Sequence, residues 1–205
     1  MDRGGCAGRE MTLSVGVLVS GRGTNLQAIL DACASGTLAA RVVFVASNRD
    51  GVPALIRAKR AGVPCAAFTL EAHGTRAAAQ NAMADALVRT GARLIVLAGF
   101  DHILTPGFFV KLARVPIINV HPALLPLFGG RGMHGDRVHE AVLAAGALES
   151  GVTVHRVHPD TVDLGEVVVQ RRVQVQPGDD VPALSARVLA EEHKAIVDAI
   201  RTFAA

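Results

Sequence analysis

Aromatic side chains are scarce in this chain, which has no Trp, no Tyr and only seven Phe among its 205 residues. The core must therefore be built from Val, Leu, Ile and Ala. Proteins that bind single-stranded nucleic acid stack the bases on aromatic rings, and few rings are present here. The formal charge is a modest +3, with arginines scattered rather than gathered in one run. These features argue against a nucleic-acid partner and suit a small anionic substrate.

Long apolar runs, paired cysteines and metal-ligand patterns are also missing. No stretch reaches the length of a membrane span, and no signal peptide is visible. The three cysteines, Cys6, Cys33 and Cys65, form no C-x-x-C pair, which is typical of reduced thiols. No group of Cys, His and Asp has the spacing of metal ligands, so we expect no metal. The sequence predicts a cytoplasmic protein without membrane contact.

Apolar, β-branched runs alternate with helical patterns along most of the chain. We expect strands at 14–20, 41–47, 64–70, 93–99, 115–121, 151–157 and 167–175, and helices from 26, at 53–61, 75–89, 106–112, 136–145 and 184–203. This alternation predicts an α/β fold: a Rossmann-like, open, mostly parallel sheet with helices on both faces and an antiparallel C-terminal edge strand. Gly-rich, polar residues 1–11 predict a flexible leader, and 12–205 a single domain.

Two polar side chains stand at the end of the fifth predicted strand. Asn119 and His121 are two residues apart, so in a strand both point to the same face. Pro122 ends the strand directly after them. Ligands of open α/β sheets bind where strands end, so this amide and imidazole are candidate catalytic groups. The alternative is that Asn119 caps a turn and His121 is a boundary histidine with satisfied hydrogen bonds.

A glycine turn, Gly21-Arg-Gly-Thr-Asn25, joins the first strand to the helix that follows. Glycines allow close approach of the backbone, and the free N–H groups of a helix N-terminus attract anions. The turn lacks the spacing of a dinucleotide fingerprint or a Walker A loop, so a single phosphate suits it better than a pyrophosphate. A tight turn with Thr24 or Asn25 as helix cap fits the motif equally well.

Two further loops follow strands and carry polar groups. Residues 127–135 are rich in glycine, and Arg131 and His134 within them either meet a substrate or belong to a plain flexible loop. Residues 158–165 hold two carboxylates, Asp160 and Asp163. Either acid is a candidate partner for a histidine, or a turn-forming residue in a solvated loop.

Taken together, these residues resemble the folate-dependent formyltransferase family. Its shared signature is Ile118-Asn-Val-His-Pro-Ala-Leu-Leu-Pro126. Further markers are Ser20-Gly-Arg-Gly-Thr-Asn-Leu-Gln27, Ser47-Asn48, Ala98-Gly-Phe100, Gly151-Val-Thr-Val-His155 and Glu192-His193. The glycine turn and the total length point to the members that act on glycinamide ribonucleotide, because the methionyl-tRNA members and the formyltetrahydrofolate hydrolases carry an additional domain.

The resemblance implies transfer of a formyl group from 10-formyltetrahydrofolate to the amine of glycinamide ribonucleotide, in purine biosynthesis, through a tetrahedral intermediate. Asn119 would donate to the developing oxyanion, with a protonated His121 as a second donor or proton carrier. Asp163 matches the family's aspartate, and a nearby carboxylate would raise the pKa of the histidine. The interval from His155 to Asp163 is one residue longer than usual, which keeps Asp160 as a rival. Glu166 stands at a position where the family commonly has proline.

Binding residues follow from the same resemblance. Gly23, Thr24 and Asn25 match the phosphate-binding backbone, and Glu192 matches a residue that contacts the ribonucleotide. Folate contacts are implied for Arg76, Phe100, Asp101, His102, Ile103, Leu104 and Asn119. For Glu192 and Arg76, the alternative is an ordinary solvated helix residue, and His155 either orients its neighbours or is a satisfied strand histidine.

The implied partners are two small molecules, glycinamide ribonucleotide and 10-formyltetrahydrofolate, with no nucleic acid and no membrane; a homodimer is compatible with the sequence. Two alternatives stay open. One is a related formyltransferase that acts on another amine, such as that of a sugar nucleotide. The other is a non-catalytic nucleotide-binding module, which would need no paired Asn119 and His121.

Overall fold

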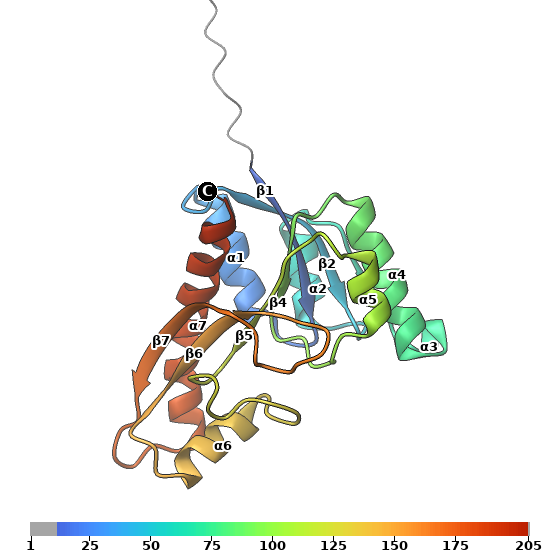
Figure 1. The fold of residues 1–205 in the computed structure, drawn as a ribbon. Coiled ribbons are helices and arrows are strands. Elements are labelled where there is room, and N and C mark those ends of the chain that lie inside the picture. Colours follow the sequence, from blue (N-terminus) through green and yellow to red (C-terminus); the bar gives the residue numbers. More distant parts are fainter. Residues whose placement is uncertain (1–11, 205) are drawn as a thin grey trace, which may run out of the picture.

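A seven-stranded sheet runs through the computed structural model, which describes residues 12–204 (Figure 1). The strand order is β3-β2-β1-β4-β5-β6-β7. The strands are β1 (Leu13–Val19), β2 (Ala40–Ser47), β3 (Cys65–Ala67), β4 (Leu94–Leu97), β5 (Ile117–His121), β6 (Glu149–Arg156) and β7 (Val167–Gln174). The first five are parallel, β6 is antiparallel to β5, and β7 pairs antiparallel with β6 at the edge. The predicted fold class is confirmed; the predicted leader at 1–11 lies outside the described residues.

Helices cover both faces of the sheet. Around one apolar cluster lie α1 (Thr24–Ala34), α2 (Pro53–Arg60) and α7 (Val181–Ala204). On the other face, α4 (Arg76–Arg89) and α5 (Pro106–Lys111) share a second cluster, and the short α3 (Leu70–His73) adjoins α4. The remaining helix, α6 (Asp136–Ala144), packs against α7 near the edge of the sheet (Figure 1).

The central strand β1 shows why this arrangement forms. All seven of its residues are buried, as expected for a parallel strand covered by helices on both faces. Gly16 allows α4 to approach closely, since an added Cβ there would lie 2.5 Å from Cδ2 of Leu87. Each fully buried aliphatic side chain contributes about 1.5–3 kcal/mol, so the core of Val, Leu, Ile and Ala holds the layers together without Trp or Tyr.

One predicted strand was too long. The apolar run at 64–70 predicted a strand throughout, but β3 ends at Ala67 and α3 begins at Leu70. Thr69 is the reason, because its hydroxyl accepts a hydrogen bond from the backbone N–H of Ala72 at 3.1 Å and so caps the short helix.

The direction of winding reverses between β1 and β4. From β1 the chain proceeds to β2 and β3 on one side, and from β4 it proceeds to β5 on the other. The loops after β1 and β4 therefore diverge at the carboxyl edge, where open α/β sheets form their ligand clefts. This places the glycine turn, residues 98–104 and the end of β5 around one opening.

Candidate active site

A cleft of about 630 Å³ opens at the carboxyl edge of the sheet. Its wall contains every residue that the sequence singled out for catalysis or binding: Gly23, Thr24, Asn25, Arg76, Phe100, Asp101, His102, Ile103, Leu104, Asn119, His121, Asp163 and Glu192. Arg131, His134, Asp160 and His155 line it as well. The fold thus gathers residues from almost the whole chain into one site.

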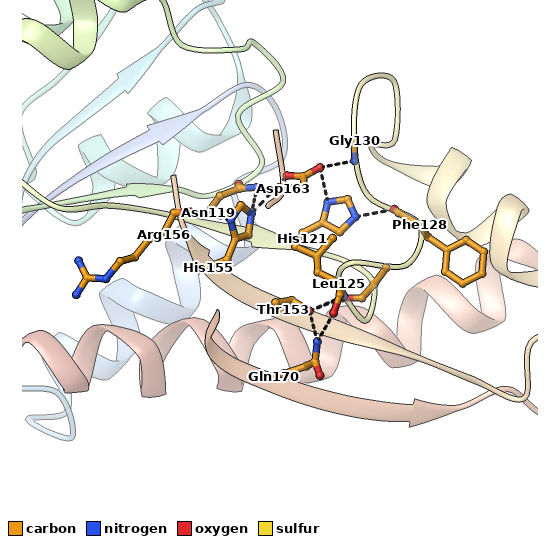
Figure 2. A network of polar contacts seen from close by, with 11 residues as sticks. Asn119, His121, Leu125, Phe128, Gly130, Thr153, His155, Arg156, Asp163 and Gln170 are labelled. Atoms are coloured by element: carbon orange, nitrogen blue, oxygen red, sulfur yellow. Dashed lines mark hydrogen bonds and ion pairs between the residues drawn. The ribbon is translucent and has the colours of Figure 1, made fainter. Parts of the chain in front are cut away.

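Asn119 and His121 lie in β5, both facing the cleft as their spacing predicted (Figure 2). β6 runs antiparallel beside them, with His155 paired to Asn119 and Thr153 paired to His121. Asn119 therefore stands in a regular strand and does not cap a turn. Its side chain is half-buried, whereas His121 is only 3% exposed.

The two nitrogens of His121 have different partners. Nε2 lies 2.8 Å from the backbone oxygen of Phe128, so it carries a hydrogen and donates (Figure 2). Nδ1 lies 3.6 Å from Oδ2 of Asp163, so it is the nitrogen that can exchange a proton near the cleft. Burial lowers the pKa of His121, and this effect outweighs the nearby Asp163 carboxylate, which raises it. The carboxylate thus acts in the expected direction, and the pKa of His121 is nevertheless lowered because burial has the larger effect.

Asp163 sits between the two histidines (Figure 2). Oδ2 accepts a hydrogen bond of 2.9 Å from the backbone N–H of Gly130, in the glycine-rich loop. Burial raises the pKa of this carboxyl, but the nearby imidazoles of His155 and His121 and the hydrogen bond from Gly130 together lower it below its usual value. Asp163 is therefore a carboxylate that joins the loop to the end of β5.

His155 orients Asn119. Nδ1 of the ring lies 3.0 Å from the backbone oxygen of Arg156 and must carry a hydrogen, so in the neutral ring Nε2 accepts from the Asn119 amide at 3.3 Å. One of the two amide hydrogens of Asn119 remains for the cleft. The same Nε2 lies 3.4 Å from Oδ1 of Asp163, so a protonated His155 would donate to that carboxylate instead.

The geometry separates the two candidate acids. Asp160 is exposed and has no hydrogen bond or ion pair with any residue in 12–204, whereas the Asp163 side chain is 11% exposed and has three polar partners. Asp163 has a φ of 57°, a left-handed conformation that Asp tolerates better than most residues. Gly165 is required beside it, because an added Cβ would lie 1.8 Å from the backbone oxygen of Arg156. Glu166, in place of proline, pairs with Arg156 at 3.1 Å.

The glycine turn leaves the start of α1 open to the cleft. Gly23 is the N-cap residue with φ 71°, and no side chain caps the helix. The alternative in which Thr24 or Asn25 caps it was therefore wrong; Asn25 instead donates to Oε2 of Glu192 at 2.6 Å. Burial raises the pKa of Glu192. An uncapped helix N-terminus with free N–H groups is a favourable site for a phosphate.

Replacement of Gly23 by Val should destabilise the protein by about 2 kcal/mol or more, because the positive φ suits only glycine and a Cβ would lie 2.6 Å from Cβ of Ala54. Gly21→Ala is the matched control, since a Cβ at Gly21 meets nothing within 4 Å. Denaturant unfolding measures both. Equal stability of the two variants would show that the turn is not constrained as described.

Residues 98–104 form the opposite wall, and Gln80 of α4 holds them in place. Gln80 is 2% exposed; its amide nitrogen donates to the backbone oxygen of Ile103 at 3.1 Å, and its oxygen accepts from the N–H of Thr105 at 2.6 Å. Phe100 and Leu104 are buried in this wall. The sequence analysis missed Gln80, because a glutamine in a helix is usually solvated.

Gln80→Leu should cost about 1–3 kcal/mol of stability, because the N–H of Thr105 and the carbonyl of Ile103 lose their hydrogen-bond partner in a partly buried setting. It should also raise the KM for the ligand that this wall binds. The control is Arg89→Gln, an exposed residue at the end of the same helix. Thermal unfolding and steady-state kinetics test both effects; a variant with unchanged stability and KM would contradict the bracing role.

Asp101 is occupied by protein partners. Its carboxylate accepts from Nδ2 of Asn48 at 2.9 Å and pairs with Arg49, and its N–H donates to the hydroxyl of Ser20 at 3.0 Å. The side chain therefore joins the ends of β2 and β4, and the backbone N–H ties the same residue to the end of β1, so neither the carboxylate nor the N–H is left for a ligand. His102 packs edge-on against Phe100, and burial lowers its pKa, with Arg76 adding to the effect.

The formyl transferase family model matches residues 13–200 of the chain. The chain belongs to the formyl transferase family. It is 38% identical over 180 residues to phosphoribosylglycinamide formyltransferase of Haemophilus influenzae, covering 88% of this chain and 82% of that relative. It is 40% identical over 192 residues to the trifunctional purine biosynthetic protein adenosine-3 of Gallus gallus. That match covers 94% of this chain but only 18% of the longer relative.

Solved structures agree with the family assignment. Glycinamide ribonucleotide transformylase 1 from Symbiobacterium toebii superimposes with a TM-score of 0.86 at 40% identity, covering 94% of this chain and 88% of that one. The corresponding enzyme from Geobacillus kaustophilus gives a TM-score of 0.85 at 33% identity, covering 95% and 100%. The formyl transferase fold is thus matched over nearly its full extent.

The turn after His121 is held by two polar side chains that the sequence analysis did not single out for a role (Figure 2). Thr153 is fully buried; its hydroxyl donates to the oxygen of Ala123 at 2.7 Å and accepts from the N–H of Leu125 at 3.0 Å. Gln170 of β7 donates to the oxygen of Leu125 at 3.1 Å. These bonds fix the backbone that leaves His121.

Residues 12–204 contain no group of three or more His, Cys, Asp or Glu arranged to hold a metal ion. In the same range no helix has both the length and the apolar character needed to cross a membrane. The absence of a resident metal stays a prediction.

Acidification should destabilise this formyl transferase chain below about pH 6.5. Burial lowers the pKa of four histidines, His102, His121, His139 and His193, below the ordinary value of about 6.5. Between the lowered values and 6.5 the unfolded chain binds more protons than the folded chain, so stability is lost as pH falls. Thermal unfolding midpoints from about pH 8 to about pH 5 test this; a flat or rising midpoint on acidification contradicts it.

Proposed function

We propose that the chain transfers the formyl group of 10-formyltetrahydrofolate to the primary amine of glycinamide ribonucleotide. One observation carries this most strongly: Asn119, His121 and Asp163 meet in the cleft between the open N-terminus of α1 and the wall at 98–104. A phosphate-type site and an apolar wall thus flank the groups that acyl transfer needs. The family relatives named above support the same reaction.

His121 supplies the proton transfer in this proposal. Because burial lowers its pKa, the ring is neutral at pH 7 and Nδ1 can accept a proton from the attacking amine, directly or through a water. Once charged, Nδ1–H faces the Asp163 carboxylate at 3.6 Å, which stabilises the imidazolium. Phe128 holds the ring by its other nitrogen. The same proton can then pass to the folate nitrogen that leaves.

Asn119 stabilises the charge that develops on the formyl oxygen. Attack by the amine gives a tetrahedral intermediate with an oxyanion, which needs hydrogen-bond donors already in place. With His155 accepting one amide hydrogen of Asn119, the other is held towards the cleft without reorganisation. Charged His121 is the second donor at the later stage, as the proton moves.

Binding is divided between the two walls. The N–H groups of Gly23, Thr24 and Asn25 would hold the single phosphate, and Glu192 would accept from the ribose. The wall formed by Phe100, Ile103 and Leu104 offers apolar side chains with backbone hydrogen-bonding groups, which suits a flat, polar-edged pterin ring. Arg76 and His102 at its rim would meet the anionic tail of the folate.

The test is an assay with 10-formyltetrahydrofolate and a choice of amines, following the absorbance change as folate is released. We expect turnover with glycinamide ribonucleotide. The second candidate acceptor is a sugar-nucleotide amine, but the single-phosphate geometry of the glycine turn favours the ribonucleotide. Turnover with a sugar amine and none with glycinamide ribonucleotide would overturn the proposal. A cytoplasmic location and a homodimer stay predictions.

A further inference from the structure

A third histidine stands in the wall of the cleft without a role in the reaction described above. His139 lies in the first half of α6, soon after the glycine-rich loop, and its side chain is 3% exposed. The ring lines the cleft, as do Ser185, Leu189 and Glu192 of α7, the helix against which α6 packs (Figure 1). Its position is therefore on the ribonucleotide side, away from the folate wall.

The imidazole of His139 lacks the hydrogen bonds that the other buried histidines of the site make. His121 and His155 each have a ring nitrogen bonded to a backbone oxygen. Nδ1 of His139 is buried and has no hydrogen-bond partner among residues 12–204. Buried polar groups in folded proteins are almost always paired, so an unpaired one in a ligand cleft indicates a partner that arrives with the ligand. Burial lowers the pKa of His139, so the neutral ring offers one donor and one acceptor.

We propose that His139 binds the ribonucleotide directly, through a hydrogen bond to a hydroxyl or amide group in the part between its phosphate and its amine. This inference rests on the proposed function. In the proposed function the open N-terminus of α1 at Gly23 holds the phosphate end, and His121 meets the amine end. α6 reaches between them, because it packs on the helix that carries Glu192, and His139 lines the same cleft as His121. His139 is thus a binding and specificity residue for the acceptor and does not transfer protons.

The substitution that tests this is His139→Phe, which keeps a flat buried ring and removes both nitrogens. Because the nitrogen of the free protein is unpaired, the variant should be at least as thermally stable as the original chain. The Kd and KM for glycinamide ribonucleotide should rise about tenfold, since a buried hydrogen bond is lost. The KM for 10-formyltetrahydrofolate should stay unchanged, and kcat at saturating ribonucleotide should change little. Glu140→Gln, exposed on the same helix, is the control and should alter nothing.

Two amide substitutions of His139 identify which ring nitrogen binds the ribonucleotide. An Asn at position 139 places its amide near Nδ1 and a Gln places it near Nε2, so one of His139→Asn and His139→Gln should recover much of the ribonucleotide affinity. In the original chain, the ¹⁵N signals of the His139 ring should shift on addition of ribonucleotide but not of folate, which requires no substitution. Unchanged ribonucleotide affinity in folded His139→Phe, or unshifted ring signals, would overturn the inference and leave His139 as a packing residue. An original chain that neither binds nor formylates the ribonucleotide would refute the proposed function before any variant is made.

Discussion

His121→Ala should lower kcat by about 10²–10⁴-fold while the affinity for glycinamide ribonucleotide stays nearly unchanged. The ring is buried at the end of β5, with Nε2 fixed by Phe128 and Nδ1 facing Asp163, so its contribution is made as the proton moves. An interaction made only in the transition state affects kcat, whereas one made equally in the ground state affects KM. Single-turnover kinetics with titration of the ribonucleotide separates the two.

The control for His121→Ala is a measurement of its stability, which shows whether the variant is still folded. His121 is almost fully buried, so Ala leaves a cavity and some loss of stability is expected. His121→Asn, which fills more of that space, should be equally inactive if the imidazole itself is required. A folded variant in which affinity and turnover fall by the same factor would contradict the assignment of His121 to proton transfer.

Asp163→Asn should lower kcat by about 10²-fold or more and change the pH profile in a defined direction. The carboxylate raises the pKa of His121, so its removal leaves burial opposed only by the hydrogen bond to Phe128, and that pKa falls further. The acidic limb of the kcat/KM profile should therefore move to lower pH, even though the maximum rate is reduced. Asn still accepts from the N–H of Gly130, so the loop should remain in place.

Asp160→Asn is the matched comparison, because this acid lines the same cleft but is exposed. It should retain nearly full activity with an unshifted profile. If Asp160→Asn were the inactive variant and Asp163→Asn the active one, the alignment of the loop after β6 would be wrong and Asp160 would be the acid.

The sequence predicted the fold and two parts of the cleft, the end of β5 and the glycine turn, because these depend on local patterns, whereas Arg76, residues 100–104 and Glu192 followed only from the family resemblance. Two-residue spacing placed Asn119 and His121 on one face of β5, and a glycine turn between a strand and a helix placed Gly23 at the open end of α1. Chain order alone then predicted which loops meet, since parallel strands share a carboxyl edge. The error at 64–70 was also local, because an apolar run outweighed the capping preference of Thr69.

The supporting residues were not predictable in the same way. Gln80 and Thr153 are ordinary polar residues in a helix and a strand, and only the packed structure makes them buried partners of loop backbone. The pKa of His121 likewise depends on a competition between burial and Asp163 that spacing does not reveal. His139 belongs to none of the sequence motifs that indicated the site. It stands out only because its Nδ1 has no hydrogen-bond partner among the described residues.

The most direct test of the central claim follows the formyl carbon itself. The protein is incubated with glycinamide ribonucleotide and 10-formyltetrahydrofolate labelled with ¹³C in the formyl group, and the products are identified by mass spectrometry. Direct transfer at Asn119 and His121 predicts the label on the amine of the ribonucleotide, with an equal amount of tetrahydrofolate and no label in formate. Labelled formate beside an unmodified ribonucleotide would contradict the account, because the site would then deliver the formyl group to water.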